Sequence, residues 1–320
     1  MGSCEYKISV IIPAFNAEKT IETCIDGLLS QTLRDIEIIV VDDCSSDKTS
    51  AIMSDYEKTY ADVTLISLDK NVGSGLARNA GLIHATGEYI GFSDADDWID
   101  SAAYEQMYVA AKSFDADMAV CGMATEWGDY LASSQRYAYP SLTILEGRQA
   151  LRSFTRSVSW DVVLSAIVNN KIYRADLLKE NSISFTAERY AQDNYFTFFA
   201  LAFSNRVALV PGVAFHYLQR DESESHSFTT DYLDGMIETL SDIKEELARR
   251  DIYEVYQDEY KSLLHRCVDS TVRRMFAQYG QNSKTRDLTC HFIEESVRKF
   301  GLSFLLDTLD VETLRKLTTS

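Results

Sequence analysis

Short apolar runs alternate with amphipathic segments along the first third of the chain. The predominantly apolar runs are Ile8–Pro13, Ile36–Val41, Val63–Leu68 and Tyr89–Phe92. Apolar runs of this length are typical of parallel strands that are buried on both faces. The segments between them have helical length and spacing. The pattern therefore predicts right-handed βαβ units and a parallel sheet with helices on its faces.

The helices expected between these strands are recognised from capping residues and from apolar residues at helical spacing. Asn16 is expected to cap the first helix, in which Ile21, Ile25 and Leu28 recur at helical spacing. Further helices are expected at about 48–59, 76–84 and 101–113.

The pattern changes after residue 113, where short strands and isolated helices replace the regular alternation. Helices are expected at Glu146–Phe154 and Tyr195–Ala202. The expected strands are Met118–Met123, Thr143–Leu145, Val162–Val168, Ile183–Phe185, Val207–Val210 and Val213–Tyr217. Irregular spacing of this kind indicates a mixed extension of the sheet rather than more βαβ units.

From about Asp231 the sequence becomes helical and highly charged. One apolar stripe consists of Leu233, Met236, Ile237, Leu240, Ile243 and Leu247, and a second begins at Tyr256 and Tyr260. We expect these stripes to pack on one another, on the α/β domain, or across a homo-oligomer. The chain is therefore divided into an α/β domain at 1–227, with halves at about 6–115 and 116–227, and a helical C-terminal region at 231–320.

Net charge and composition argue against some classes of function. The net charge is −18, which argues against nucleic acid as a partner because phosphate binding needs a basic surface. The cysteines are scattered without a C-x-x-C pair, as expected for reduced, buried thiols. No apolar run reaches 18 residues and no signal-peptide segment is visible. We expect a cytoplasmic location, with peripheral contact to the inner face of a membrane as an option.

Three carboxylates follow the fourth apolar run directly. Asp94, Asp96 and Asp97 stand beyond its carboxyl end, which is where open α/β sheets bind ligands. Asp94 and Asp96 form an Asp-x-Asp pair, and such oxygen ligands suit Mn²⁺ or Mg²⁺ with positions left for substrate phosphates. The alternative is a strand end at which Asp97 caps the next helix.

Gly73, Gly75 and Arg78 follow the third apolar run. Together they match a dinucleotide fingerprint poorly, because Arg78 stands in place of the third glycine. We interpret the glycines as a tight turn that presents Arg78 to a phosphate or a base. The alternative is an arginine exposed to solvent at a helix N-terminus.

Other candidate polar residues lie at expected element ends. Asp43, at the end of the second strand, could accept a uracil N3–H or ribose hydroxyls, or could cap a helix. Asp193 precedes an apolar helix and could be a general base or an N-cap. Glu188 is the reserve candidate for the base. His216 is carried as a candidate metal ligand, although a single histidine is more often structural.

Several motifs occur in the order that they have in one family. They are Ile8–Asn16, Ile38–Asp47, Asn71–Gly73, Ala77–Gly81, Thr86–Ile90 and Asp94–Asp97. Over about residues 6–100 this sequence closely resembles glycosyltransferase family 2, whose members have the GT-A fold and include enzymes of bacterial surface-polysaccharide synthesis. The resemblance is weaker over 160–227 and absent after 231.

The resemblance implies roles for the candidate residues. Pro13, Phe15, Asp43 and Arg78 would line the nucleotide pocket. Asp94 would hold the ribose or sugar, and Asp96 would bind the metal ion that bridges the diphosphate. Asp193 would be the catalytic base. This sequence departs from the family pattern at Cys44, where glycine is common, and at Gln192, where glutamate is usual.

The function implied is an inverting, metal-dependent glycosyltransferase. It would move a hexosyl or N-acetylhexosaminyl group from a nucleotide sugar, with uridine as the expected nucleoside, to a hydroxyl of a glycan or a lipid-linked oligosaccharide. Alternatives are a nucleotidyltransferase, another nucleotide-binding α/β enzyme such as a Rossmann oxidoreductase, and a non-catalytic sugar-binding homologue.

Overall fold

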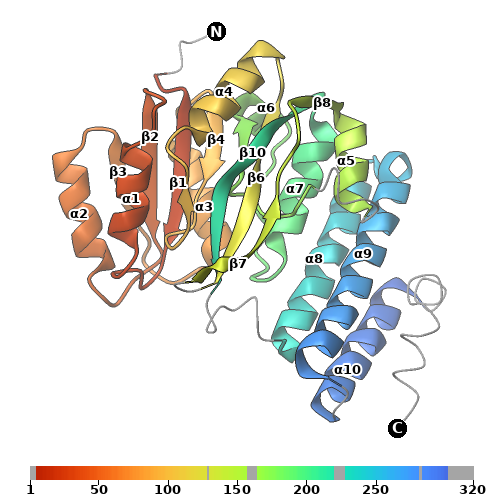
Figure 1. Ribbon diagram of the computed structural model, residues 1–320. Coiled ribbons are helices and arrows are strands. Elements are labelled where there is room, and N and C mark those ends of the chain that lie inside the picture. The colour runs from red at the N-terminus through yellow and green to blue at the C-terminus, as the bar shows by residue number, and fades with distance from the viewer. Residues whose placement is uncertain (1–4, 128–129, 157–163, 220–227, 281–282, 302–320) are drawn as a thin grey trace.

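A mixed sheet of ten strands runs through the centre of the molecule (Figure 1). The computed structural model describes residues 5–127, 130–156, 164–219, 228–280 and 283–301. Within those residues the strand order is β3-β2-β1-β4-β9-β6-β10-β5, with β7 paired to β6 and β8 paired to β10. The predicted α/β class with a mixed sheet and C-terminal helices is confirmed.

The first half of the sheet is parallel, as the sequence predicts. Its strands are β1 (Ile8–Ala14), β2 (Ile36–Asp42), β3 (Val63–Ser67) and β4 (Tyr89–Phe92). Every residue of β1 and β4 is buried, which explains why both strands are apolar without alternation. The intervening helices are α1 (Ile21–Leu29), α2 (Thr49–Thr59) and α3 (Ser74–His84).

The second half of the sheet is mixed in direction. Strand β9 (Lys171–Arg174) runs antiparallel to β4 and joins the two halves. The other strands are β5 (Trp98–Ile99), β6 (Met118–Trp127), β7 (Tyr130–Tyr137), β8 (Thr143–Glu146) and β10 (Arg206–Gln219). The helices here are α4 (Ala103–Ser113), α5 (Gly147–Thr155), α6 (Ala175–Glu180) and α7 (Gln192–Phe203).

Two of the expected strands are not strands in the structure, and both differences have the same cause. Ile183 and Phe185 are buried, but Ile183–Phe185 is not a strand, because the Asn79 side chain accepts from Phe185 N at 2.8 Å and donates to Phe185 O at 2.9 Å. Within Val162–Val168, residues 162–163 lie outside the described residues and the rest is not a strand. There, side chains from other elements bind the Ala166 and Ile167 carbonyls. In both segments, hydrogen bonds from side chains satisfy backbone groups that a neighbouring strand would otherwise bind.

Two further expectations are corrected. The expected strands Val207–Val210 and Val213–Tyr217 form the single strand β10, with register irregularities after Val210 and Val213. Asn16 does not cap α1, which begins at Ile21 after Thr20. Instead, the Asn16 side chain accepts from the Ser46 backbone N–H at 2.9 Å and so joins two loops at the sheet edge.

The C-terminal helices pack on one another and on the α/β part, as predicted. They are α8 (Thr230–Arg249), α9 (Tyr253–Tyr279) and α10 (Ser283–Phe300). Figure 1 shows them at the end of the molecule opposite α2 and β3. One hydrophobic cluster contains core residues of the sheet together with the first stripe of α8. The proposed division near residue 230 stays a prediction, and the core is continuous across it.

A buried carboxylate also joins the C-terminal helices to the α/β part. Glu259 on α9 is 2% exposed, and it accepts hydrogen bonds from Arg148 Nε at 3.1 Å and Arg152 Nε at 2.9 Å, both on α5. Burial alone would raise the pKa of Glu259, but the two guanidinium groups lower it. The ionised carboxylate is therefore favoured at this junction.

No helix in the described part of the chain has the length and apolar character needed to cross a membrane. Cys24, Cys121 and Cys267 are free and buried as expected, whereas Cys44 and Cys290 are free and exposed.

Candidate active site

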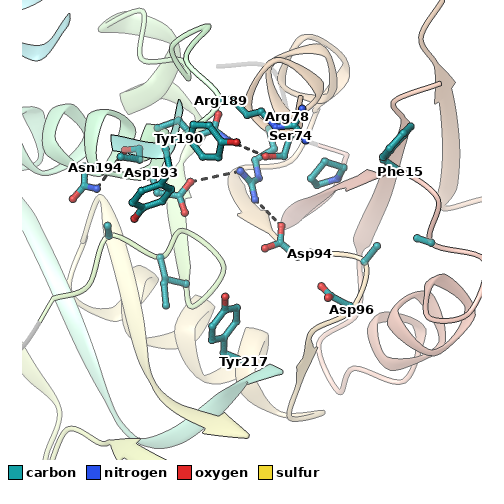
Figure 2. Close-up of a pocket in the computed structure, with 18 of the residues that line it drawn as sticks. Phe15, Ser74, Arg78, Asp94, Asp96, Arg189, Tyr190, Asp193, Asn194 and Tyr217 are labelled. Atoms are coloured by element: carbon teal, nitrogen blue, oxygen red, sulfur yellow. Dashed lines mark hydrogen bonds and ion pairs between the residues drawn. The ribbon is translucent and has the colours of Figure 1, made fainter. Parts of the chain in front are cut away.

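A cavity of about 620 Å³ lies where the carboxyl ends of β1 and β4 meet the starts of α3 and α7. Figure 2 shows its side chains converging from these elements. Most of the predicted site residues line it, namely Pro13, Phe15, Arg78, Asp94, Asp96 and Asp193. The strand ends bring the N-terminal candidates together, and the fold adds Asp193 from a segment about one hundred residues later in the chain.

Arg78 lies at the centre of this arrangement. It is 4% exposed, its Nη2 atom donates to Asp94 Oδ1 at 2.6 Å, and its Nη1 atom lies 3.5 Å from Asp193 Oδ1 (Figure 2). Its guanidinium carbon lies 5.2 Å from the centre of the Phe185 ring. Burial alone would lower the pKa of Arg78, but the two carboxylates raise it. The alternative of a solvent-exposed arginine is wrong.

Asp193 lies in the first turn of α7 rather than at its N-cap, which is Ala191. The capping alternative for Asp193 is therefore wrong. Burial and, to a lesser extent, the nearby Asp94 raise the pKa of Asp193, whereas Arg78 and Lys171 lower it. The net result is a pKa above the ordinary aspartate value. About a third of its side chain remains exposed, and it faces the cavity. A carboxylate with a raised pKa in a cavity is suited to accept a proton.

The turn before α3 fixes the position of Arg78. Gly73 caps α3 with φ of +89°, a conformation that favours glycine. The Asp43 carboxylate accepts from Val72 N at 2.7 Å and from Gly73 N at 2.8 Å. Asp43 is 2% exposed and is not among the described residues that line the cavity. Its nucleotide-binding role stays a prediction, while its structural role is to hold this turn.

Gln192, which stands where the family usually has glutamate, packs against the start of α3. Its Nε2 atom donates to Ser74 Oγ at 2.8 Å. A side chain on Gly75 would overlap with the Gln192 amide, so glycine at residue 75 permits this close approach. The starts of α3 and α7, and with them Arg78 and Asp193, are thereby held side by side.

The donor set of the cavity fits a metal ion that is shared with a substrate. No group of three or more histidine, cysteine or acidic residues suited to hold a metal exists among the described residues. Asp94 is paired with Arg78, whereas Asp96 also lines the cavity and is half-buried. One carboxylate together with substrate phosphates is an ordinary coordination set for Mg²⁺. Asp96 therefore fits the predicted role.

His216 lies outside the cavity lining as the structure describes it. Its ring stacks on Trp98 with centroids 5.1 Å apart, and its Nε2 atom lies 3.2 Å from Asp100 Oδ1. Its role as a metal ligand stays a prediction, and the geometry gives this nitrogen another partner.

Lys171 is a site residue that the sequence analysis did not identify. Its side chain is 0% exposed, and its Nζ atom donates to Ile167 O and, at 2.7 Å, to Asn170 Oδ1. Ile167 lines the cavity, so Lys171 supports one of its walls. Burial lowers the pKa of Lys171 to about 7. Only the tertiary structure reveals this residue, because a lysine in a short strand carries no sequence signal of burial.

Three tyrosines to which the sequence analysis assigned no role also line the cavity. They are Tyr190, Tyr217 and Tyr232. Tyr190 and Tyr217 lie within 160–227, where the resemblance to the family is weaker. Tyr232 flanks the apolar stripe of α8, and nothing in its spacing distinguishes it from a residue that packs in the core.

Comparisons with known proteins identify the family of this chain. Residues 9–180 match the family model described as "Glycosyl transferase family 2". The chain belongs to glycosyltransferase family 2. A poly(ribitol-phosphate) beta-glucosyltransferase of Bacillus spizizenii is 33% identical over 231 residues, 69% of this chain and 33% of that protein. The glycosyltransferase EpsJ of Bacillus subtilis, named as uncharacterized, is 33% identical over 68% of this chain and 62% of its own length.

Among solved structures, Staphylococcus aureus TarS residues 1–349 in complex with UDP-GlcNAc matches with a TM-score of 0.63 at 20% identity. The match covers 92% of this chain and 89% of that one, and it shows a shared fold. Full-length TarS is a poly(ribitol-phosphate) beta-N-acetylglucosaminyltransferase, and the chain aligns with 42% of it. The chain spans between about a third and three-fifths of the length of the curated relatives it matches.

The buried Lys171 generates a prediction about stability and pH. Its pKa of about 7 in the folded chain lies below the ordinary value of 10.5. Between these values the unfolded state binds more protons, so folding stability gains from rising pH. From pH 7 to pH 9 the stability of the wild type should rise relative to that of Lys171→Met, by up to about 1.4 kcal/mol per pH unit. Urea denaturation at several pH values measures this difference.

Lys58→Met is the matched control, because the Lys58 side chain is 70% exposed. Its stability difference from the wild type should not change over the same pH range. Identical pH dependence in Lys171→Met and the wild type would show that Lys171 does not titrate as described.

Proposed function

We propose that the chain is an inverting, metal-dependent glycosyltransferase that uses a nucleotide sugar, with uridine diphosphate as its nucleotide. The observation that carries the proposal is the cavity in which Asp94, Asp96, Arg78 and Asp193 converge. Family membership and the resemblance to TarS, whose structure contains UDP-GlcNAc, support the choice of donor. The sugar moved would be a hexosyl or N-acetylhexosaminyl group, and the acceptor a hydroxyl of a glycan or a lipid-linked oligosaccharide.

Pro13 and Phe15 would bind the nucleoside at the end of β1. The Phe15 side chain is 49% exposed beside the cavity, and an exposed aromatic ring there can stack on a base. Asp96 would hold Mn²⁺ or Mg²⁺ together with the diphosphate. When bound, such a cation neutralises the negative charge that develops on the leaving group.

Asp193 would act as the general base from the other side of Arg78. In an inverting reaction the acceptor hydroxyl displaces the nucleoside diphosphate in one step and loses its proton as it attacks. Arg78 keeps Asp193 and Asp94 in one cavity, because its charge lies between two carboxylates that would otherwise repel each other. Burial of Asp193 makes it a stronger base than an exposed aspartate.

The alternatives fit less well. A Rossmann oxidoreductase needs its glycine turn after the first strand, whereas Gly73 and Gly75 lie at the start of α3, after the third strand. A nucleotidyltransferase needs a basic loop that holds phosphates near the N-terminus, and Pro13–Asn16 at the end of β1 contains no lysine or arginine. A non-catalytic homologue would have no use for three carboxylates in one cavity, two of them paired with a buried arginine. The predicted cytoplasmic location, membrane contact and homo-oligomer stay predictions.

The metal role of Asp96 is tested by nucleotide affinity. Uridine diphosphate should bind the wild type at least about tenfold more tightly with Mn²⁺ or Mg²⁺ than with excess chelator, because the nucleotide and Asp96 share the cation. Asp96→Ala should lose this difference and its transfer activity. Isothermal titration calorimetry measures the affinities, with Asp100→Ala as the control because Asp100 is exposed and outside the lining. Equal affinities with and without chelator in the wild type would contradict the metal site.

The role of Asp193 is tested by the rate and its pH dependence. Asp193→Asn should lower turnover of the nucleotide sugar by about 10²–10⁴, the usual contribution of a general base, with little change in nucleotide affinity. Because burial raises the pKa of Asp193, wild-type activity should fall on acidification at a pH above the ordinary aspartate pKa of 3.8. The variant should lack this acidic limb.

Glu188→Gln is the matched control for Asp193→Asn. Glu188 is not among the described residues that line the cavity, so its variant should stay near wild-type turnover. Turnover above about a tenth of wild type in Asp193→Asn would transfer the role of base to another group.

A further inference from the structure

Three tyrosines from different elements line the same cavity as Asp193. Tyr190 precedes α7, Tyr217 is in β10, and Tyr232 is in the first turn of α8. Each is half-buried, so part of each side chain remains accessible. Figure 2 shows Tyr217 pointing into the cavity and Tyr190 near Asp193, while Phe15 lies at the other end. Tyr190 therefore lies apart from Phe15, the residue proposed to bind the nucleoside.

The C-terminal helices hold Tyr232 in place. Its ring lies 5.4 Å from the Tyr190 ring and 5.6 Å from the Phe228 ring, both at steep angles. Burial raises the pKa of Tyr232, and a hydrogen-bonded Arg274 on α9 lowers it. The Arg274 guanidinium carbon also lies 5.2 Å from the centre of the Phe228 ring. Tyr232 thus has fixed neighbours on two sides, and a rigid aromatic ring binds with little loss of entropy.

Tyr190 is held by α8 as well. Its carbonyl accepts from Thr239 Oγ1 at 2.7 Å. Its ring packs on Gly235, where an added Cβ would come within 2.9 Å of the ring, so glycine allows the ring to approach the helix backbone. Next to the base, Asn194 Oδ1 accepts from Arg266 of α9 at 3.2 Å. The C-terminal helices therefore shape the wall of the cavity on the Asp193 side.

An aromatic wall beside a carboxylate base suits a particular kind of acceptor. A pyranose ring has an apolar face of C–H groups that can lie on an aromatic ring, while its hydroxyl groups reach polar partners. An acyclic polyol phosphate has no such face. The carboxylates that line the cavity (Asp94, Asp96 and Asp193) outnumber its arginines (Arg78 and Arg189), so a phosphate without an accompanying cation is disfavoured there. The local chemistry favours an uncharged ring.

We propose that Tyr190, Tyr217 and Tyr232 form an acceptor subsite that takes a neutral pyranose residue, and that α8 supplies part of it. This inference rests on the proposed glycosyltransferase function and specifies its acceptor. It also gives the helical C-terminal region a direct part in substrate binding.

The test is saturation-transfer NMR with methyl β-D-glucopyranoside, methyl N-acetyl-β-D-glucosaminide and ribitol 5-phosphate, in the presence of UDP and Mg²⁺. The proteins are the wild type, Tyr232→Phe, which keeps the ring, and Tyr232→Leu, which removes it. Ring protons of at least one glycoside should receive saturation from the wild type and Tyr232→Phe. Affinity for that glycoside should fall about tenfold in Tyr232→Leu, and ribitol 5-phosphate should give no signal.

Tyr253→Leu is the control, because Tyr253 is a half-buried tyrosine of α9 outside the described lining of the cavity. It should bind the glycoside like the wild type. Thermal unfolding of each variant identifies any that fail to fold, and Tyr217→Leu replaces Tyr232→Leu in that event. Binding of ribitol 5-phosphate alone, binding of none of the probes, or unchanged glycoside binding in the leucine variant would overturn the proposal.

UDP affinity, measured separately by calorimetry, distinguishes failure of the acceptor subsite from failure of the proposed function. UDP binding without glycoside binding would contradict the acceptor subsite alone. No UDP binding to the wild type would contradict the proposed function itself.

Discussion

The buried guanidinium of Arg78 is the interaction on which the site depends. A charge that is 4% exposed needs compensation, and Arg78 receives it from Asp94 at the end of β4 and Asp193 at the start of α7. The two carboxylates come from distant parts of the sequence and would separate without the positive charge between them. Satisfying one buried charge thus sets the distance between Asp94 and Asp193 in the cavity.

The surrounding structure holds Arg78 in this position. Asp43 binds the turn before α3 through two backbone N–H groups, and Gly75 lets Gln192 pack closely on the same helix. Gln192 donates to Ser74 Oγ without adding a charge beside Asp193. The C-terminal helices complete the arrangement by contacting Tyr190 and Asn194. The start of α7, which carries Asp193, is therefore packed between α3 and the C-terminal helices.

Local patterns predict the first four strands and the carboxylates at their ends, because buried parallel strands are continuously apolar and their carboxyl ends meet at one edge. They fail at Ile183–Phe185, where the Asn79 side chain takes the place of a neighbouring strand. They also fail at Lys171 and Tyr232, whose roles depend on contacts between residues far apart in the chain. The burial of Arg78 could not be read from its neighbours, since its partners Asp94 and Asp193 become adjacent only in the fold.

The central claim is that the cavity around Arg78 holds donor and base together. A crystal structure of the chain with UDP and Mn²⁺, with the metal located by its anomalous signal, tests this most directly. The account predicts the metal beside Asp96, the uracil beside Phe15, and the ion pairs of Arg78 with Asp94 and Asp193 retained. A nucleotide bound outside this cavity, or a metal held away from Asp96, would contradict it.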